Sequence, residues 1–434
     1  MERIALKRLN EWKDKQNRKP LIVQGARQVG KTWLMQEFGR LQFSKVAYFI
    51  FEQNEQLKAL FEKDVNTDRL LESLGILAGF KITPNDTLII FDEIQECPNA
   101  LTSLKYFYEQ KPEYHIIAAG SLLGVALHGG MSFPVGKVEF LNLYPLSFYE
   151  FLSAMGQDMA LEQIRKNNFA ILTPLHDTFI DWVKRYFYVG GMPEVVKAFA
   201  EHRDYQEARS LQQAILRSYE NDFSKHVPKD GLPKLKMLWS SIPGQLAKEN
   251  KKFIYSKIQK GARAKEFENA LTWLEACGLI YKVYRVKKPD LPLVAYQDLT
   301  AFKIYVSDVG LLSAMSSLDA KTLLSPSDVF EEFKGALTEQ YVLQELKNLL
   351  EMPLAYWANE SGTNEVDFII QTGSEIVPVE VKASTNLRAK SLKWYMEKFN
   401  PNRAVRLSAA TFKQENNLTD LPLYAVPQIV SVLE

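Results

Sequence analysis

Eight residues that begin at Gly25 have the types and spacing of a phosphate-binding loop. The segment GARQVGKT follows the apolar run Leu21 to Val23 and matches the pattern G-x-x-x-x-G-K-[ST]. In such a loop, backbone N–H groups surround phosphate oxygens, the lysine reaches the β- and γ-phosphates and the hydroxyl holds magnesium. A chance glycine turn would supply neither this strand nor the amphipathic helix that follows. We predict that ATP and Mg²⁺ bind at Gly25, Ala26, Arg27, Gln28, Val29, Gly30, Lys31, Thr32 and Trp33.

Polar residues also end two later apolar strands. The run Thr87 to Phe91 leads into Asp92 and Glu93. Asp92 is expected to contact magnesium through water and Glu93 to orient or deprotonate the attacking water; the alternative is a helix N-cap. His115 to Ala119 leads through Gly120 to Ser121, which we expect near the γ-phosphate, with a simple turn residue as the alternative.

A second set of chemical groups lies near the C-terminus. Glu339 occupies an otherwise leucine-lined stripe of a helix expected over residues 330–350, where a carboxylate requires a partner. Asp367 lies in the strand NEVDFII, and Glu380 and Lys382 share one face of the strand VPVEVK.

This spacing resembles the PD-(D/E)xK nuclease core, although Val366 replaces the proline of that pattern. The resemblance implies that Asp367 and Glu380 bind Mg²⁺, that Glu339 completes the metal environment, and that Lys382 positions or activates water. The alternatives are a nuclease-like domain that only binds nucleic acid or uses these charges structurally, and an unrelated structure.

Residues 248–288 carry eleven basic and four acidic side chains, a local net charge of +7, within a chain whose net charge is +1. A short helix opening at Ser256, a helix over residues 264–276 and a basic strand over 279–285 resemble a winged-helix module. We predict phosphate contacts from one group of basic residues, with a solvated packing domain as the alternative. The group comprises Lys257, Lys260, Arg263, Lys265, Arg285, Lys287 and Lys288.

Several segments together resemble AAA-type ATPases that carry a C-terminal domain of unknown function. They are GARQVGKTWL, LIIFDEIQ, AAGSLLG, SFPVGKVEFLNLYPLSFYEFL and YVGGMPEVV. The resemblance spans nearly the whole chain and implies an additional-strand catalytic-glutamate topology, a sensor at Ser121 and a lid around Gly190 to Pro193. Lys137 stands where the family is expected to have an arginine, and a lysine cannot form a bidentate fork there.

Length and composition limit the remaining possibilities. The chain has 434 residues, of which 46% are hydrophobic and 24% charged, which excludes disordered, collagen-like and disulfide-scaffold proteins. Cys97 and Cys277 are expected to be buried thiols. The N-terminal segment lacks a continuous apolar centre and no apolar run reaches the length of a membrane span, so we predict a cytoplasmic protein without a membrane partner.

The segment pattern predicts an α/β fold with four modules. The expected architecture is a P-loop NTPase (AAA-type) parallel-sheet core, a helical lid, a winged-helix module and a C-terminal restriction-endonuclease-like α/β domain. Their expected bounds are 1–150, 151–230, 231–318 and 319–434.

Two classes of function fit these features. One is an ATPase that couples hydrolysis to nucleic-acid binding or cleavage, with DNA favoured over RNA. The other is a nucleotide-controlled switch that holds a protein partner and has an inactive nuclease-like domain. A homo-oligomer fits either class, whereas Asp92-Glu93 and the lack of an acceptor site disfavour a small-molecule kinase.

Overall fold

The computed structural model describes residues 3–121, 134, 136–247, 252–324 and 331–433. The chain forms two compact units. The first contains residues 1–144 and 276–279, and the second contains residues 145–275 and 280–434. No helix among the described residues is both long and apolar enough to cross a membrane.

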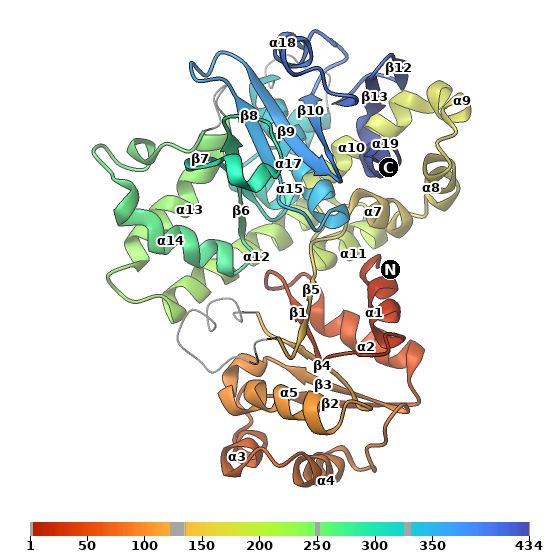
Figure 1. Cartoon of the computed structure of the whole chain (residues 1–434), viewed down its shortest axis with the longest axis vertical. Coiled ribbons are helices and arrows are strands. Elements are labelled where there is room, and N and C mark those ends of the chain that lie inside the picture. Colours follow the sequence, from red (N-terminus) through yellow and green to blue (C-terminus); the bar gives the residue numbers. More distant parts are fainter. Residues whose placement is uncertain (1–2, 122–133, 135, 248–251, 325–330, 434) are drawn as a thin grey trace. The chain divides into compact units, whose positions relative to one another are not determined.

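The first unit is built on a five-stranded parallel sheet of order β2-β3-β4-β1-β5 (Figure 1). β4 therefore lies between β1 and β3, which is the topology that the AAA-type resemblance implies. Every residue of β3 is buried, as expected for a central strand covered on both faces. The strands are β1 (Leu21–Gln24), β2 (Lys45–Ile50), β3 (Thr87–Asp92), β4 (His115–Ala119) and β5 (Glu139–Asn142).

Helices cover both faces of this sheet. The helices are α1 (Ala5–Lys13), α2 (Lys31–Gln42), α3 (Glu55–Lys63), α4 (Thr67–Ala78), η1 (Ile94–Glu96) and α5 (Pro98–Gln110). The side chains of α3, α4 and α5 share one core with alternate residues of the strands, including Phe49, Ile89 and Phe91. On α2, Leu34 and Phe38 are fully buried, and Phe38 contacts Trp12 of α1.

The second unit begins with helices. They are α7 (Phe148–Ala154), α8 (Asp158–Arg165), α9 (Phe169–Leu172), η2 (Thr173–Leu175), α10 (His176–Val189), α11 (Pro193–His202), α12 (Tyr205–His226), α13 (Leu232–Leu246), η3 (Tyr255–Lys257) and α14 (Ala264–Ala276). A capping box at Ser147 starts α7, because its side chain accepts from the N–H of Glu150 while the Glu150 carboxylate accepts from the N–H of Ser147.

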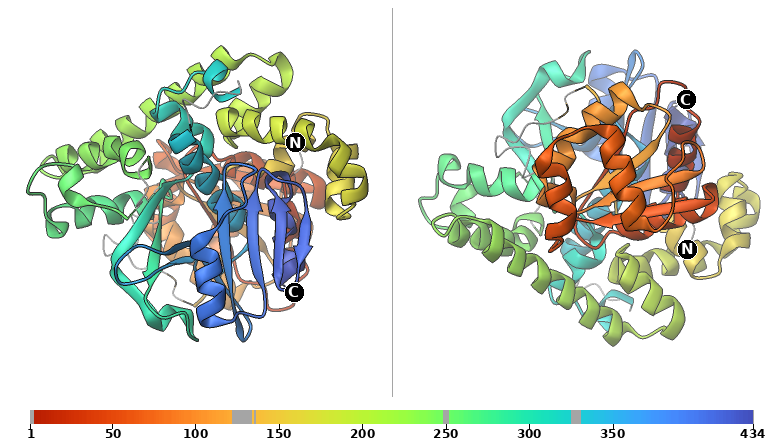
Figure 2. Two further views of the ribbon diagram at one scale, coloured as in Figure 1. Left: turned by 90° about the horizontal axis from the view of Figure 1, so that it is seen from above. Right: turned by 90° about the horizontal axis from the view of Figure 1, so that it is seen from below.

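An eight-stranded mixed sheet of order β12-β13-β11-β10-β9-β8-β6-β7 completes the second unit (Figure 2). Its strands are β6 (Ile280–Val286), β7 (Gln297–Val306), β8 (Ala355–Ala358), β9 (Glu365–Thr372), β10 (Glu375–Lys382), β11 (Ala404–Ser408), β12 (Lys413–Glu415) and β13 (Leu418–Pro422). The accompanying helices are α15 (Val309–Met315), α16 (Ala320–Leu324), α17 (Glu331–Leu349), η4 (Leu293–Tyr296), α18 (Lys390–Phe399), η6 (Leu423–Gln428) and α19 (Ile429–Leu433). Trp357 and Tyr395 pack α18 against this sheet.

The arrangement of the second unit differs from the expected division at residue 318. β6 and β7, which were expected to belong to a winged-helix module, hydrogen-bond into the same sheet as β8 to β13. The expected lid helices also belong to this unit. The expected helix over residues 264–276 is present as α14, whereas Ser256 lies in a single 3-10 turn.

Candidate functional site

The phosphate-binding loop connects β1 to α2 at the carboxyl end of the first sheet. Gly25 has a φ of +148°, and a Cβ there would lie 2.1 Å from the carbonyl oxygen of Leu143. Gly30 has a φ of +93° and directly precedes the first turn of α2. Both positions therefore favour glycine for a conformational or steric reason. The nine predicted nucleotide-binding residues form this one continuous loop and helix start.

Lys31 is held inside the loop. Its ammonium group donates to the carbonyl oxygens of Gly25 and Ala26, each at 2.9 Å, and the residue is only 7% exposed. Burial lowers the pKa of Lys31 to about 8, although the nearby Glu93 and Asp92 carboxylates oppose that shift. A negatively charged ligand bound beside Lys31 would stabilise its ammonium form.

Thr32 and Asp92 meet at the ends of α2 and β3. The Thr32 hydroxyl donates to Asp92 Oδ2 at 2.7 Å, and the Tyr48 hydroxyl of β2 donates to the same oxygen at 2.8 Å. Asp92 is buried. A hydroxyl and a carboxylate are ligands that Mg²⁺ prefers, so this pair fits the predicted metal. Burial raises the pKa of Tyr48, and the negative charge of Asp92 raises it further, so the Tyr48 hydroxyl stays a neutral donor.

Glu93 is the next residue and adopts a left-handed conformation with a φ of +50°. Its Oε2 accepts from Gln95 Nε2 at 2.6 Å and from the Ser121 hydroxyl at 3.1 Å. Ser121 follows the end of β4, so the structure brings together the residues that were predicted at three separate strand ends. The Glu93 carboxylate is thereby fixed at the carboxyl edge of the sheet, where ligands of open α/β sheets bind.

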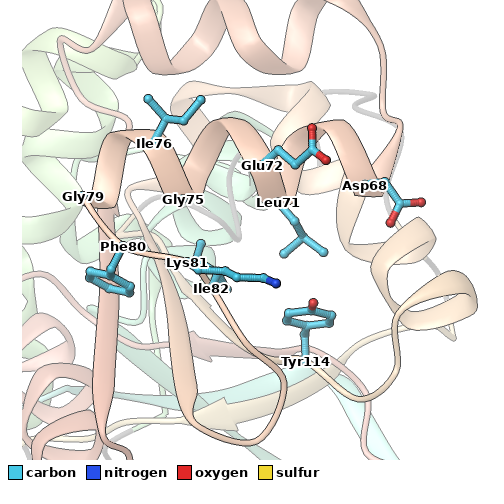
Figure 3. A pocket seen from close by; sticks show the side chains of 10 residues that line it. All are labelled: Asp68, Leu71, Glu72, Gly75, Ile76, Gly79, Phe80, Lys81, Ile82 and Tyr114. Carbon is cyan, nitrogen blue, oxygen red and sulfur yellow. The ribbon is translucent and has the colours of Figure 1, made fainter.

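A pocket of about 720 Å³ lies elsewhere in the first unit (Figure 3). Its lining includes Leu71 and Ile76 of α4 together with Lys81 and Tyr114, and Leu71 points toward Tyr114. Tyr114 directly precedes β4, so this pocket is at the amino end of a strand whose carboxyl end leads to Ser121. No residue of the phosphate-binding loop lines it.

The C-terminal residues predicted from the sequence are also close together, but they surround a lysine that the sequence reasoning missed. Lys303 of β7 is fully buried, and its Nζ lies 2.5 Å from Glu365, 3.6 Å from Glu339 and 3.7 Å from Asp367. Burial opposes its charge, but the three carboxylates and Tyr305 raise the pKa of Lys303 well above the ordinary value. The surrounding carboxylates therefore favour the ammonium form of Lys303.

Glu380 and Lys382 of β10 form a second ion pair, with 2.6 Å between Oε1 and Nζ. Glu380 is almost fully buried, whereas the Lys382 side chain is 31% exposed. Burial raises the pKa of Glu380 despite the opposing effect of Lys382. Over the described ranges, no group of three or more His, Cys, Asp or Glu residues is arranged to hold a metal ion.

Comparison with known families divides the chain into three parts. Residues 17–152 match the family described as AAA domain. Residues 180–322 match a domain of unknown function, DUF8612, and residues 334–426 match another, DUF4143. No curated protein matches the chain.

Residues 17–152 are an AAA domain. The predicted resemblance to AAA-type ATPases with a C-terminal domain of unknown function is thus confirmed.

Solved structures that resemble this chain have low sequence identity to it. The Walker-type ATPase of Pyrococcus abyssi is 15% identical, with a TM-score of 0.47, over 73% of this chain and 95% of that chain. The Orc1 protein of Aeropyrum pernix in complex with DNA is 14% identical, with a TM-score of 0.27, over 74% and 93%. Cdc6p from Pyrobaculum aerophilum is 11% identical, with a TM-score of 0.25, over 74% and 94%.

Within the AAA domain, Lys137 has a local partner. Its ammonium group lies 3.0 Å from the Glu109 carboxylate and 5.4 Å from the centre of the Tyr108 ring. Lys137 thus contacts α5 through a point charge and an aromatic face, as a lysine can do without the bidentate geometry of arginine.

The predicted phosphate-contacting residues outside the AAA domain fall into two groups. Lys257, Lys260, Arg263 and Lys265 are exposed around η3 and the start of α14. The other three already face carboxylates: Arg285 lies 2.5 Å and Lys287 3.8 Å from Asp298, and Lys288 lies 2.5 Å from Asp290. Among the described residues, only the first group combines exposed side chains with the absence of an ion pair to a carboxylate.

The Gly190–Pro193 segment, expected in a lid, is closely packed in the second unit. A Cβ on Gly191 would lie 2.1 Å from the Leu146 carbonyl oxygen, and its N–H donates to Asp308 Oδ2 at 2.6 Å. Burial raises the pKa of Asp308 to about 6, although the hydrogen bonds from Gly191 and Leu311 oppose this shift. A Cβ on Gly190 would lie 2.2 Å from Asp308 Oδ1, so both glycines are explained by the close approach of the backbone to its neighbours.

Proposed function

We propose that the AAA domain binds ATP with Mg²⁺ and hydrolyses it. The observation that carries this proposal is the contact of Thr32 with Asp92 at 2.7 Å, beside the buried Lys31 and the fixed Glu93. The loop N–H groups and Lys31 bind phosphate oxygens, and Thr32 and Asp92 hold the magnesium. Bound magnesium supplies positive charge that stabilises the charge developing on the phosphoryl group.

Glu93 orients the attacking water and accepts its proton in this proposal. Its hydrogen bond with Ser121 keeps the carboxylate at the end of β4, between the strands that carry the loop and Asp92. Ser121 acts through Glu93 and is therefore a positioning residue.

The test is ATP turnover by the full chain compared with Lys31→Ala. Loss of the ammonium should reduce turnover strongly because neutral alanine leaves the phosphate charge uncompensated. Lys105→Ala is a matched control, since Lys105 lies on α5 and its ammonium contacts the Tyr106 ring. Equal turnover by wild type and Lys31→Ala would contradict the proposal.

We further propose that ATP hydrolysis is coupled to nucleic-acid binding by the second unit, with DNA favoured. The four exposed basic residues around η3 and α14 support this proposal because phosphate contacts need accessible cations. Lys260→Glu with Arg263→Glu should weaken binding and flatten its salt dependence, whereas Lys288→Glu should change both less, since Lys288 is paired with Asp290.

The second candidate is a nucleotide-controlled switch that holds a protein partner. It is favoured by the ion pairs that already occupy Arg285 and Lys288. If the wild-type protein does not bind DNA even at low salt, the nucleic-acid proposal is rejected and this second candidate is favoured.

A further inference from the structure

The carboxylate cluster of the second unit, formed by Glu339, Glu365, Asp367 and Glu380, has a built-in cation. Lys303 reaches it from β7, while the carboxylates come from α17, β9 and β10. Its ammonium group lies within 4 Å of three of the four carboxylates. We propose that Lys303 takes the place of a divalent cation, so that the native cluster neither binds Mg²⁺ nor cleaves nucleic acid.

Three oxygen atoms of Asp367 and Glu339 that could bind a metal already face other groups. Asp367 Oδ2 accepts from the backbone N–H of Val381 at 2.9 Å, and Asp367 Oδ1 faces Lys303. Glu339 Oε2 accepts from the Tyr305 hydroxyl at 3.2 Å and also faces Lys303. These contacts leave the carboxylates oriented around an ammonium group.

The position of Lys303 is fixed by its surroundings. The side chain has no exposed surface, and its Nζ lies 5.0 Å from the centre of the Tyr356 ring, a cation–π contact that adds to the ion pairs. Mg²⁺ requires near-octahedral oxygen ligation and usually keeps several waters. A divalent cation on Glu339 and Asp367 would meet the positive charge of Lys303 at close range.

Glu380 does not replace the missing ligands. Its Oε1 pairs with Lys382 at 2.6 Å, and its buried Oε2 has no hydrogen-bond partner among the described residues, so Glu380 offers one unpaired oxygen where Mg²⁺ requires near-octahedral ligation. The residues expected from the nuclease resemblance are therefore present and close together, yet they do not fit the metal that the resemblance implies. This inference is independent of the proposed ATPase activity, because all of these groups lie in the second unit.

The test measures Mn²⁺ binding to nucleotide-free full chain by the loss of the free Mn²⁺ electron paramagnetic resonance signal. Wild type is paired with Asp367→Asn, and Lys303→Met is paired with Lys303→Met/Asp367→Asn. Any Mn²⁺ bound at Thr32 and Asp92 contributes equally within each pair and cancels. Methionine keeps the length of the lysine side chain but removes its charge.

We expect the first pair to bind equal amounts of Mn²⁺, and Lys303→Met to bind one more Mn²⁺ per chain than its double variant. Greater binding by wild type than by Asp367→Asn would overturn the proposal, as would Mg²⁺-dependent cleavage of DNA or RNA that Asp367→Asn abolishes. A folded Lys303→Met that gains no site would also overturn it. If Lys303→Met fails to fold, the wild-type pair and the cleavage assay decide the outcome.

Discussion

Nucleotide binding should be accompanied by proton uptake at alkaline pH because Lys31 is buried. Its pKa is lowered to about 8 in the free protein by burial. Phosphate oxygens beside the ammonium favour its charged form, so binding raises this pKa. At pH 7 about nine-tenths of the free protein already carries the charge, and binding takes up only about a tenth of a proton at Lys31. At pH 9 these fractions are reversed, and binding takes up about nine-tenths of a proton.

The same linkage determines the sign of the affinity change. Below the free-state pKa, Lys31 is charged in both states and affinity does not depend on its titration. Above that pKa, binding must first protonate Lys31, so the contribution of this group to Mg²⁺–ADP affinity falls about tenfold between pH 7 and pH 9. Isothermal titration in buffers of different ionisation enthalpy measures both quantities.

Lys31→Arg is the matched variant, because a guanidinium stays charged throughout this pH range. It should show no extra proton uptake at pH 9, even where its affinity is weaker. Equal uptake at pH 7 and pH 9 by wild type, or the same pH-dependent uptake by Lys31→Arg, would refute the reasoning that Lys31 is the titrating group.

Three substitutions test other contacts. Gly25→Ala should abolish ADP binding and lower the unfolding temperature, because its Cβ would lie 2.1 Å from the Leu143 carbonyl; Gly79→Ala, also at positive φ but with open space, should leave binding intact, and equal binding by both would contradict the steric argument. Tyr48→Phe removes a hydrogen bond worth about 0.5–1.5 kcal/mol, so ATP turnover should require up to about tenfold more Mg²⁺; an unchanged Mg²⁺ dependence would show that Tyr48 does not orient Asp92. Ser147→Ala removes one half of the capping box and should lower the free energy of unfolding by about 1 kcal/mol in chemical denaturation, whereas no change would mean that water replaces the cap.

The proximity of the residues in the proposed nucleotide site was predictable because these residues follow local rules. The loop pattern is contiguous in sequence, and Asp92 and Ser121 each follow an apolar run that becomes a parallel strand. Carboxyl ends of parallel strands meet at one edge of a sheet, so sequence position predicts spatial proximity. Tyr48 was missed, because its contact with Asp92 depends on the pairing of β2 with β3.

Lys303 was missed for a different reason. The expected division at residue 318 assigned it to a different module from Glu339 and Asp367, and a lysine in a strand suggests an exposed edge. A local signal was present, since Lys303 and Tyr305 are two residues apart and share one face of β7, where both contact Glu339. Only the joining of β7 to the C-terminal sheet places that face against the carboxylates.

The buried thiols follow the sequence prediction, since Cys97 and Cys277 are both buried and neither forms a disulfide. In the basic segment over residues 248–288, fewer cations are available for phosphate contacts than the sequence predicted. Net charge counts every cation equally, but Arg285 is paired with Asp298 and Lys288 with Asp290. Both aspartates follow residue 288, so the charge count over residues 248–288 did not include them. The footprint available to phosphates is correspondingly smaller than the +7 of that segment indicates.

ATP turnover by Glu93→Gln, measured beside its ATP affinity, tests the proposed hydrolysis most directly. Glutamine preserves the shape of the side chain and a hydrogen-bond acceptor for Ser121 but cannot accept a proton from water. We predict ATP affinity close to that of wild type and turnover reduced by about a hundredfold or more. Turnover equal to that of wild type would contradict the assignment of Glu93 as the base, and with it the proposed mechanism of hydrolysis at this site.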